Sequence, residues 1–253
     1  MIWDTHAHLD DSQFETDREI VIERAREAGI TTIVNIGHTE SSCSEAVKLA
    51  GRYPFIYATV GIHPHDAKDC TEKTWELLLK LSQNPKVVAW GEIGLDYYRD
   101  LSPRDVQRQV FIRQLELANE TGLPVIIHNR DAHGDIIEVI KKHLPSAGGV
   151  FHSYSGSWEM AEELLRLGFY LSFSGPLTFK NARHTLKVAV NVPEDRFVVE
   201  TDSPYLTPEP YRGKRNEPGY VREVVAKIAE IKGLPFERVA QLSSNNAKRL
   251  FGL

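Results

Sequence analysis

Six side chains that can bind a divalent cation each follow a short apolar run of this chain. They are His6, His8, Glu92, His128, His152 and Asp202. The runs before them are rich in β-branched or aromatic residues, which indicates β-strands. A (β/α)8 barrel builds its active site from side chains at the carboxyl ends of successive strands. We therefore expect the six side chains to converge on one opening.

The first two candidates lie in the segment Asp4–His8, which reads DTHAH. Residues i and i+2 of a strand point to the same side. His6 and His8 can therefore bind one cation through neutral imidazoles. A His-x-His tripeptide alone is a weak signal, and its place at the end of the first expected strand makes it a candidate metal site.

Two carboxylates are further candidate ligands. Glu92 ends the apolar run Val87–Glu92, where a bare buried charge would be costly, so it has to be paired, hydrogen-bonded or metal-bound. Its two oxygens allow it to bridge two cations. Asp202 follows the last expected strand, which lies beside the first in a closed barrel. Asp202 is thus expected to face His6 and His8, to bind the same ion and to accept a proton from a metal-activated water.

His128 and His152 end two further apolar runs, and for either one alone a hydrogen-bonded core histidine is the alternative. Together with the other four, they give a set of imidazoles and carboxylates. This set suits Zn²⁺, Mn²⁺ or another first-row ion better than Ca²⁺. The number of ligands predicts two divalent ions per subunit, and the sequence does not decide between Zn²⁺, Mn²⁺ and Mg²⁺.

Strand-like runs alternate with helix-like segments from end to end. The expected strands are Met1–Asp4, Thr31–Ile36, Ile56–Ile62, Val87–Glu92, Leu123–His128, Gly149–His152, Tyr170–Ser174 and Phe197–Thr201. Helical periodicity before Gly29, Gly122 and Gly168 indicates helices that stop at glycine. Eight such units predict an α/β fold, a single (β/α)8 TIM barrel domain over residues 1–253. An open doubly wound sheet is the weaker alternative, because no GxGxxG follows the first strand.

Composition excludes several classes of protein. Apolar residues make up 42% and charged residues 26% of the chain, and no apolar run is long enough for a membrane helix. The N-terminus has no signal-peptide pattern, so we expect a cytoplasmic protein, with no membrane association and no evident obligate protein partner. A net charge of −5 argues against a protein that coats nucleic acid.

A local basic patch remains compatible with that charge. Candidates around the expected opening are Arg99, Arg104, Lys180, Arg212, Lys214 and Arg215, with solvated surface charge as the alternative. Tyr97, Tyr98 and Tyr205 could stack on a base.

Seven motifs in consistent order carry a family resemblance. They are DTHAHLD (Asp4–Asp10), GIHPH (Gly61–His65), GEIGLDY (Gly91–Tyr97), HNRDA (His128–Ala132), HSYSG (His152–Gly156), ETDSPYL (Glu200–Leu206) and NNA (Asn245–Ala247). The chain resembles the TatD-family metal-dependent deoxyribonucleases of the amidohydrolase-like barrel superfamily. The resemblance implies one ion held by His6, His8, Glu92 and Asp202, and a second held by Glu92, His128 and His152.

The resemblance also implies that His63 and His65 line the substrate site near the phosphate. Arg130 is a candidate phosphate clamp, since a guanidinium can grip two phosphate oxygens. We expect a hydrolase that cleaves DNA phosphodiester bonds, acting as an exonuclease at single strands or 3′ ends, with Asp202 and Glu92 as catalytic residues.

The sequence leaves two alternative functions. The first is a metal hydrolase of the same fold that acts on a cyclic amide, a lactone or a small phosphoester, because a barrel does not fix the chemistry. The second is a binding or scaffold protein with a vestigial site. The presence of both Glu92 and Asp202 argues against the second.

Overall fold

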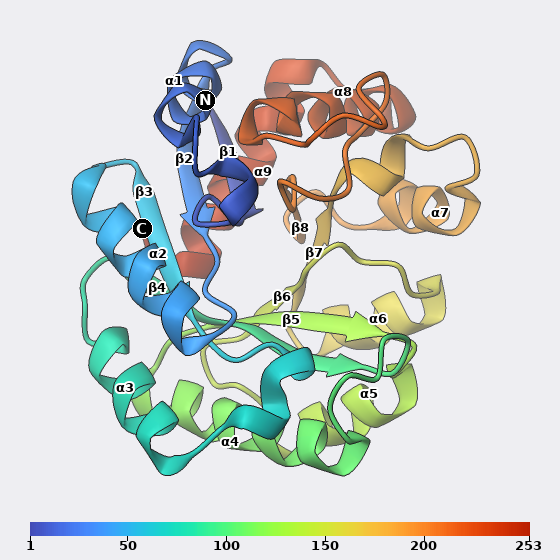
Figure 1. Ribbon diagram of the computed structural model, residues 1–253. Helices are drawn as coiled ribbons and strands as arrows, with labels where there is room; N and C mark the ends of the chain where they lie inside the picture. Colours follow the sequence, from blue (N-terminus) through green and yellow to red (C-terminus); the bar gives the residue numbers. More distant parts are fainter. The chain divides into compact units, whose positions relative to one another are not determined.

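A computed structural model describes all 253 residues, and it contains the eight predicted strands (Figure 1). They are β1 (Ile2–Ala7), β2 (Ile30–Asn35), β3 (Ile56–Val60), β4 (Val87–Asp96), β5 (Val125–Arg130), β6 (Gly149–Phe151), β7 (Tyr170–Phe173) and β8 (Phe197–Val199). Their order in the sheet is their order in the chain. This order, with a helix after each strand, is that of the predicted (β/α)8 barrel.

Nine α-helices and four 3₁₀ helices connect and follow the strands. The α-helices are α1 (Arg18–Glu27), α2 (Glu40–Arg52), α3 (Glu72–Ser82), α4 (Arg104–Thr121), α5 (His133–Lys142), α6 (Trp158–Arg166), α7 (Arg183–Asn191), α8 (Val221–Lys232) and α9 (Phe236–Phe251). The 3₁₀ helices are η1 (Ser12–Phe14), η2 (Pro64–Asp69), η3 (Gly175–Thr178) and η4 (Pro218–Tyr220). The predicted stop at Gly122 is confirmed, since it caps α4 in the left-handed region at φ 69°. None of these helices has the length and apolar character needed to span a membrane.

The chain divides into two compact units. The first comprises residues 1–35 and 153–253. In it β1 pairs with β2 and β7 pairs with β8, both in parallel. Ala7 also forms a parallel bridge with Ser203, and α9 packs against both β1 and β8. The segment after β8 therefore lies beside the end of β1, as expected for the last and first strands of a barrel.

The second unit comprises residues 36–152 and contains β3 to β6 as consecutive parallel neighbours. Helix α2 packs on β3 and α4 packs on β4. The fully buried rings of Trp90, Phe111 and Phe151 contribute to its core. Whether the whole chain behaves as one domain stays a prediction.

The predicted end of β4 at Glu92 is wrong. The strand continues to Asp96, which pairs with Arg130 of β5, and a register irregularity falls between Trp90 and Ile93. Such an irregularity re-aims the side chain at the site where it occurs, here that of Glu92. The strand can continue because Gly94, at φ 144°, lets β4 approach β5 closely. A Cβ at Gly94 would lie 2.0 Å from the carbonyl oxygen of His128.

Candidate metal centre

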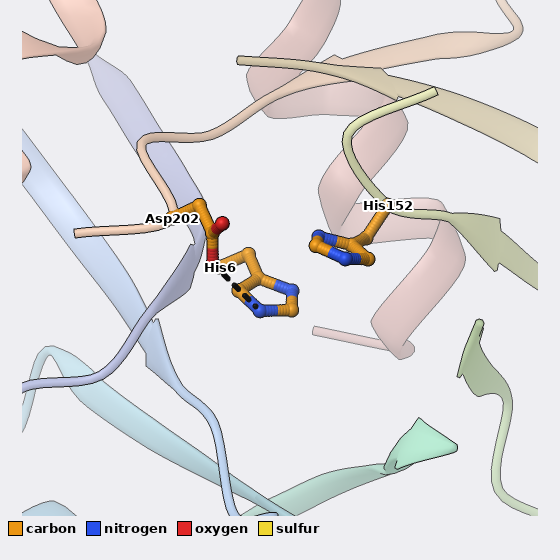
Figure 2. Close-up of side chains that lie close together, drawn as sticks. All are labelled: His6, His152 and Asp202. Carbon is orange, nitrogen blue, oxygen red and sulfur yellow. Dashed lines mark ion pairs between the residues drawn. The ribbon is translucent and has the colours of Figure 1, made fainter. Parts of the chain in front are cut away.

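The first unit holds three of the predicted ligands, which we call the first cluster: His6, His8 and Asp202. The Nε2 atoms of His6 and His8 lie 3.5 and 3.4 Å from Oδ1 of Asp202. The two Nε2 atoms lie 3.3 Å from each other. Figure 2 shows the His6 ring facing the Asp202 carboxylate, with the ion pair dashed. The structure thus brings these three residues together.

The spacing of these three atoms fits a metal ion. Ligands about 2.0–2.1 Å from a tetrahedral ion lie about 3.3–3.4 Å from one another. The three side chains are also buried, so an uncompensated carboxylate would be costly here. This donor set therefore suits one divalent cation.

Backbone hydrogen bonds place Asp202 opposite the two histidines. The N–H of Asp202 donates to the carbonyl of His6, and the N–H of His8 donates to the carbonyl of Ser203, both at 2.8 Å. Asp202 itself has a left-handed backbone with φ 58°. Aspartate tolerates this region better than most residues. Such an outlier is typical of functional sites.

Asp4 supports this arrangement and was given no role from the sequence. Its carboxylate accepts hydrogen bonds from the backbone N–H and the hydroxyl of Thr201, at 2.9 and 2.6 Å. Burial raises the pKa of Asp4 to about 8, against the lowering effect of its bonds with Thr201 and His6. Asp4 thus ties β1 to the residue before Asp202. The only sequence signal was its place at the start of the DTHAH motif.

The second unit holds the other three predicted ligands, the second cluster: Glu92, His128 and His152. Glu92 Oε1 lies 2.7 Å from His128 Nδ1 and 3.0 Å from His152 Nε2. The two histidine nitrogens are 3.3 Å apart. Burial alone would raise the pKa of Glu92, but the neighbouring histidines hold that pKa well below its usual range. Glu92 is therefore ionised and available as a ligand.

Asp96 is a candidate functional residue of this unit that no sequence pattern indicated. Its Oδ2 lies 3.0 Å from Nε2 of His65 and 3.0 Å from Nε2 of His128. Burial opposes ionisation of Asp96, but hydrogen bonds from His128 and His65 hold its pKa well below its usual range. A carboxylate behind a histidine in this way fixes the ring of a metal ligand and its tautomer. Here it directs Nδ1 of His128 toward Glu92.

The predicted substrate-contact histidines lie beside the second cluster. His63 Nε2 is 3.6 Å from Glu92 Oε1, and its ring packs edge-on against those of His65 and His128. Burial lowers the pKa of His63 well below its ordinary value, so its imidazole is neutral. Its Nδ1 accepts the backbone N–H of His65, which places the His63 proton on Nε2. His63, Glu92 and His128 also offer a group of ligand atoms within 4.8 Å of one another.

The basic candidates have different environments. Arg215 pairs with Asp17 at 2.7 Å, and Arg104 pairs with Asp100 at 3.1 Å, so both have structural partners. Arg130 ends β5, is exposed, and stacks on Tyr98 with its guanidinium carbon 3.9 Å from the ring centroid. Of these three arginines, Arg130 is the one placed to meet an external anion.

The whole chain matches one protein family. The family model described as TatD related DNase matches residues 3–252. The chain belongs to the TatD family. The predicted resemblance is thereby confirmed, and the chain is a metal-dependent hydrolase with His, Glu and Asp clusters able to bind metal.

Relatives of the family cover the chain from end to end. An uncharacterized metal-dependent hydrolase, YabD, of Bacillus subtilis is 49% identical over 252 residues, covering 99% of both chains. A protein of Escherichia fergusonii named 3′-5′ ssDNA/RNA exonuclease TatD is 33% identical, covering 100% of this chain and 99% of its own. The crystal structure of YJJV, a TatD homologue from Escherichia coli K12, superposes with a TM-score of 0.95 at 32% identity, covering 100% of this chain and 98% of that one. The likeness to YJJV confirms the predicted fold class.

Proposed function

We propose that this TatD-family hydrolase cleaves phosphodiester bonds of DNA at single strands or 3′ ends, using a metal-activated water. The observation that carries the proposal is the convergence of two imidazoles and one carboxylate in each cluster, with the spacing expected around a tetrahedral ion in the first. In each cluster, two imidazole nitrogens and one carboxylate oxygen lie between 2.7 and 3.5 Å from one another. The full-length relatives named 3′-5′ ssDNA/RNA exonuclease support the choice of substrate.

In this proposal, His6, His8, Glu92 and Asp202 would hold one ion, and Glu92, His128 and His152 would hold the other. When bound, two divalent cations lower the pKa of water and offset the charge that develops on the phosphate oxygens. Zn²⁺, Mn²⁺ and Mg²⁺ are the candidate ions.

The remaining steps belong to the protein's own side chains. Asp202 accepts the proton of the attacking water as general base, a contribution of about 10²–10⁴-fold. The Nε2–H of His63 donates to a phosphate oxygen, and His65 contacts the same group from the adjoining position. Arg130 binds the phosphate through its N–H edge.

The test is hydrolysis of single-stranded oligonucleotides by chelated protein re-supplied with Mg²⁺, Mn²⁺ or Zn²⁺. A 3′ exonuclease shortens a 5′-labelled strand stepwise and releases a 3′ label at once as a mononucleotide. The same preparations are assayed on a cyclic amide and on a simple phosphodiester. Metal-dependent turnover of the amide without cleavage of DNA would contradict the proposal.

Two matched variants exclude a contaminating nuclease. Glu92→Gln removes the charge of the second cluster with little change of shape, so we expect the cleavage to be lost. Glu76→Gln makes the same change on the exposed face of α3 and should cleave like the wild type. Equal activity of the two variants would remove Glu92 from the reaction.

A further inference from the structure

An exposed aromatic ring lies just after β4, the strand that carries Glu92. Tyr98 follows the end of β4 and has 61% of its surface exposed. The guanidinium of Arg130 covers one face of this ring, 3.9 Å from its centroid. Because so much of Tyr98 remains exposed, its other face is open to solvent.

Arg130 has no acidic partner. It forms no ion pair and no side-chain hydrogen bond within the chain, whereas Arg104, which stacks on Tyr97 at 4.4 Å, is also paired with Asp100. A guanidinium that stacks through its face keeps its N–H edge available for an anion. The Tyr98–Arg130 pair therefore offers a flat apolar surface and a fixed cationic edge.

Asp96 connects this pair to the histidines of the site. Its Oδ1 accepts the backbone N–H groups of Tyr98 and Arg99, at 3.0 and 2.8 Å, while its Oδ2 accepts from His65 and His128. One buried carboxylate thus fixes both the turn that carries Tyr98 and the ring of His128. Tyr98 and the second cluster are thus connected through a single side chain.

We propose that Tyr98 and Arg130 form a binding subsite for single-stranded nucleic acid. The open face of Tyr98 stacks on one base, and the N–H edge of Arg130 binds the adjoining phosphate. This subsite rests on the proposed nuclease function and gives it a preference for unpaired strands, because a base inside a duplex cannot offer its face to Tyr98. Stacking of a base on an aromatic side chain tolerates any sequence.

The experiment distinguishes the contribution of the base to binding from that of the phosphate. Binding of a labelled thymidine oligonucleotide, and of the same strand with abasic residues throughout, is measured by fluorescence anisotropy at low salt. Chelated protein is used, so that no cleavage occurs. Tyr98→Ala should weaken binding of the normal strand about 5- to 150-fold, since stacking contributes about 1–3 kcal/mol per base. It should leave binding of the abasic strand as in the wild type, and Tyr98→Phe should bind both strands like the wild type.

Arg130→Ala should weaken binding of both strands, because both contain phosphates. The matched control is Arg52→Ala, which removes another exposed arginine stacked on a tyrosine, at 5.6 Å, before the amino end of β3. This variant should bind like the wild type. Equal loss of both strands in Tyr98→Ala, or no loss of either, would overturn the subsite.

Failure of the proposed function has a different signature. Binding that depends on the base and on Tyr98, without metal-dependent cleavage, would support the subsite and reject only the hydrolysis. Wild-type protein that binds neither strand, but cleaves DNA when metal is added, would overturn the subsite and leave the hydrolysis standing.

Discussion

Asp202 is the proposed general base of the reaction. Asn at this position keeps the shape and one ligand oxygen but cannot accept a proton as a carboxylate does. Asp202→Asn should therefore lower kcat about 10²–10⁴-fold while changing the affinity for the oligonucleotide far less. The measurement is kcat and Kd at equal metal occupancy, determined for both proteins.

The control for this change is Asp195→Asn. Asp195 lies exposed before the amino end of β8, so its replacement should leave kcat unchanged. Asp202 lies 3.5 and 3.4 Å from the two histidines of its cluster, so metal content has to be measured alongside turnover. A fully metallated Asp202→Asn protein with wild-type turnover would show that another group is the base.

Asp96 should affect metal binding through its hydrogen bonds to the rings of His65 and His128. Asp96→Asn removes the negative charge that holds the N–H groups of His65 and His128 at Oδ2. Its amide nitrogen also cannot accept the backbone N–H groups that Oδ1 accepts. Loss of such a partner typically weakens metal binding about 10- to 100-fold. Isothermal titration of chelated protein with Zn²⁺ or Mn²⁺ measures this directly. Asp105→Asn, exposed at the start of α4, is the control, and equal affinities in the two variants would reject the positioning role.

The candidate ligands were easier to predict than the residues that position them. A histidine or carboxylate after an apolar run is visible in the sequence, and all six predicted ligands fall into one of the two clusters. Asp96 has no such signal of its own. Its role comes from hydrogen bonds to partners 31 and 32 residues away, and these depend on how β3, β4 and β5 are aligned.

At the scale of the element, the existence of every strand was predictable and the ends were not. The run before Glu92 is apolar, and the charged residue that follows it predicts the end of a strand. In the structure β4 continues to Asp96, because its polar side chains face the histidine cluster and its backbone still pairs with β5. A pattern of apolar residues cannot distinguish a polar residue that ends a strand from one that lines a site inside it.

Gly94 is the position on which this extension of β4 depends. An alanine there would place its Cβ 2.0 Å from the His128 carbonyl and hold a φ of 144° that L-residues rarely adopt. Overpacking and backbone strain each cost about 1–3 kcal/mol, so Gly94→Ala should lower the free energy of unfolding by about 3 kcal/mol or more. Chemical denaturation followed by circular dichroism measures it.

Gly134→Ala, in the same unit, should change the free energy of unfolding in the opposite direction. Gly134 lies in α5 with nothing within 4 Å of an added Cβ, so alanine should stabilise the protein by about 0.5–1 kcal/mol. If the two variants unfold at the same denaturant concentration, the close approach of β4 to β5 at Gly94 is not required by the fold.

For the whole molecule, the order of the motifs was sufficient to predict the family and the barrel, since they run from Asp4 to Ala247. The bond that is hydrolysed could not be predicted in the same way, because a barrel of this kind fixes where the ligands lie and not which substrate reaches them.

The number of metal ions per chain tests the prediction that Glu92 is a ligand of both ions. We expect two Mn²⁺ or Zn²⁺ per chain after dialysis, and a single ion with His128 and His152 unliganded would reject a bridging Glu92.

Metal should also stabilise the fold, because its ligands come from distant parts of the chain. His6 and Asp202 are 202 − 6 = 196 residues apart. The unfolded chain does not hold them together, so an ion bound by both favours the native state. At a free ion concentration about 100 times Kd, one ion contributes about 2.7 kcal/mol.

For a chain of this size, that stabilisation corresponds to a rise in Tm of about 5–10 °C. Thermal melting of chelated and Mn²⁺-loaded protein should show this rise, and Asp202→Asn should show a smaller one, because its amide is a weaker ligand than a carboxylate. Asp195→Asn should keep the full shift. An unchanged Tm in protein that contains two ions would mean that the unfolded chain binds them equally well. The first cluster would then not join the two ends of the chain through metal.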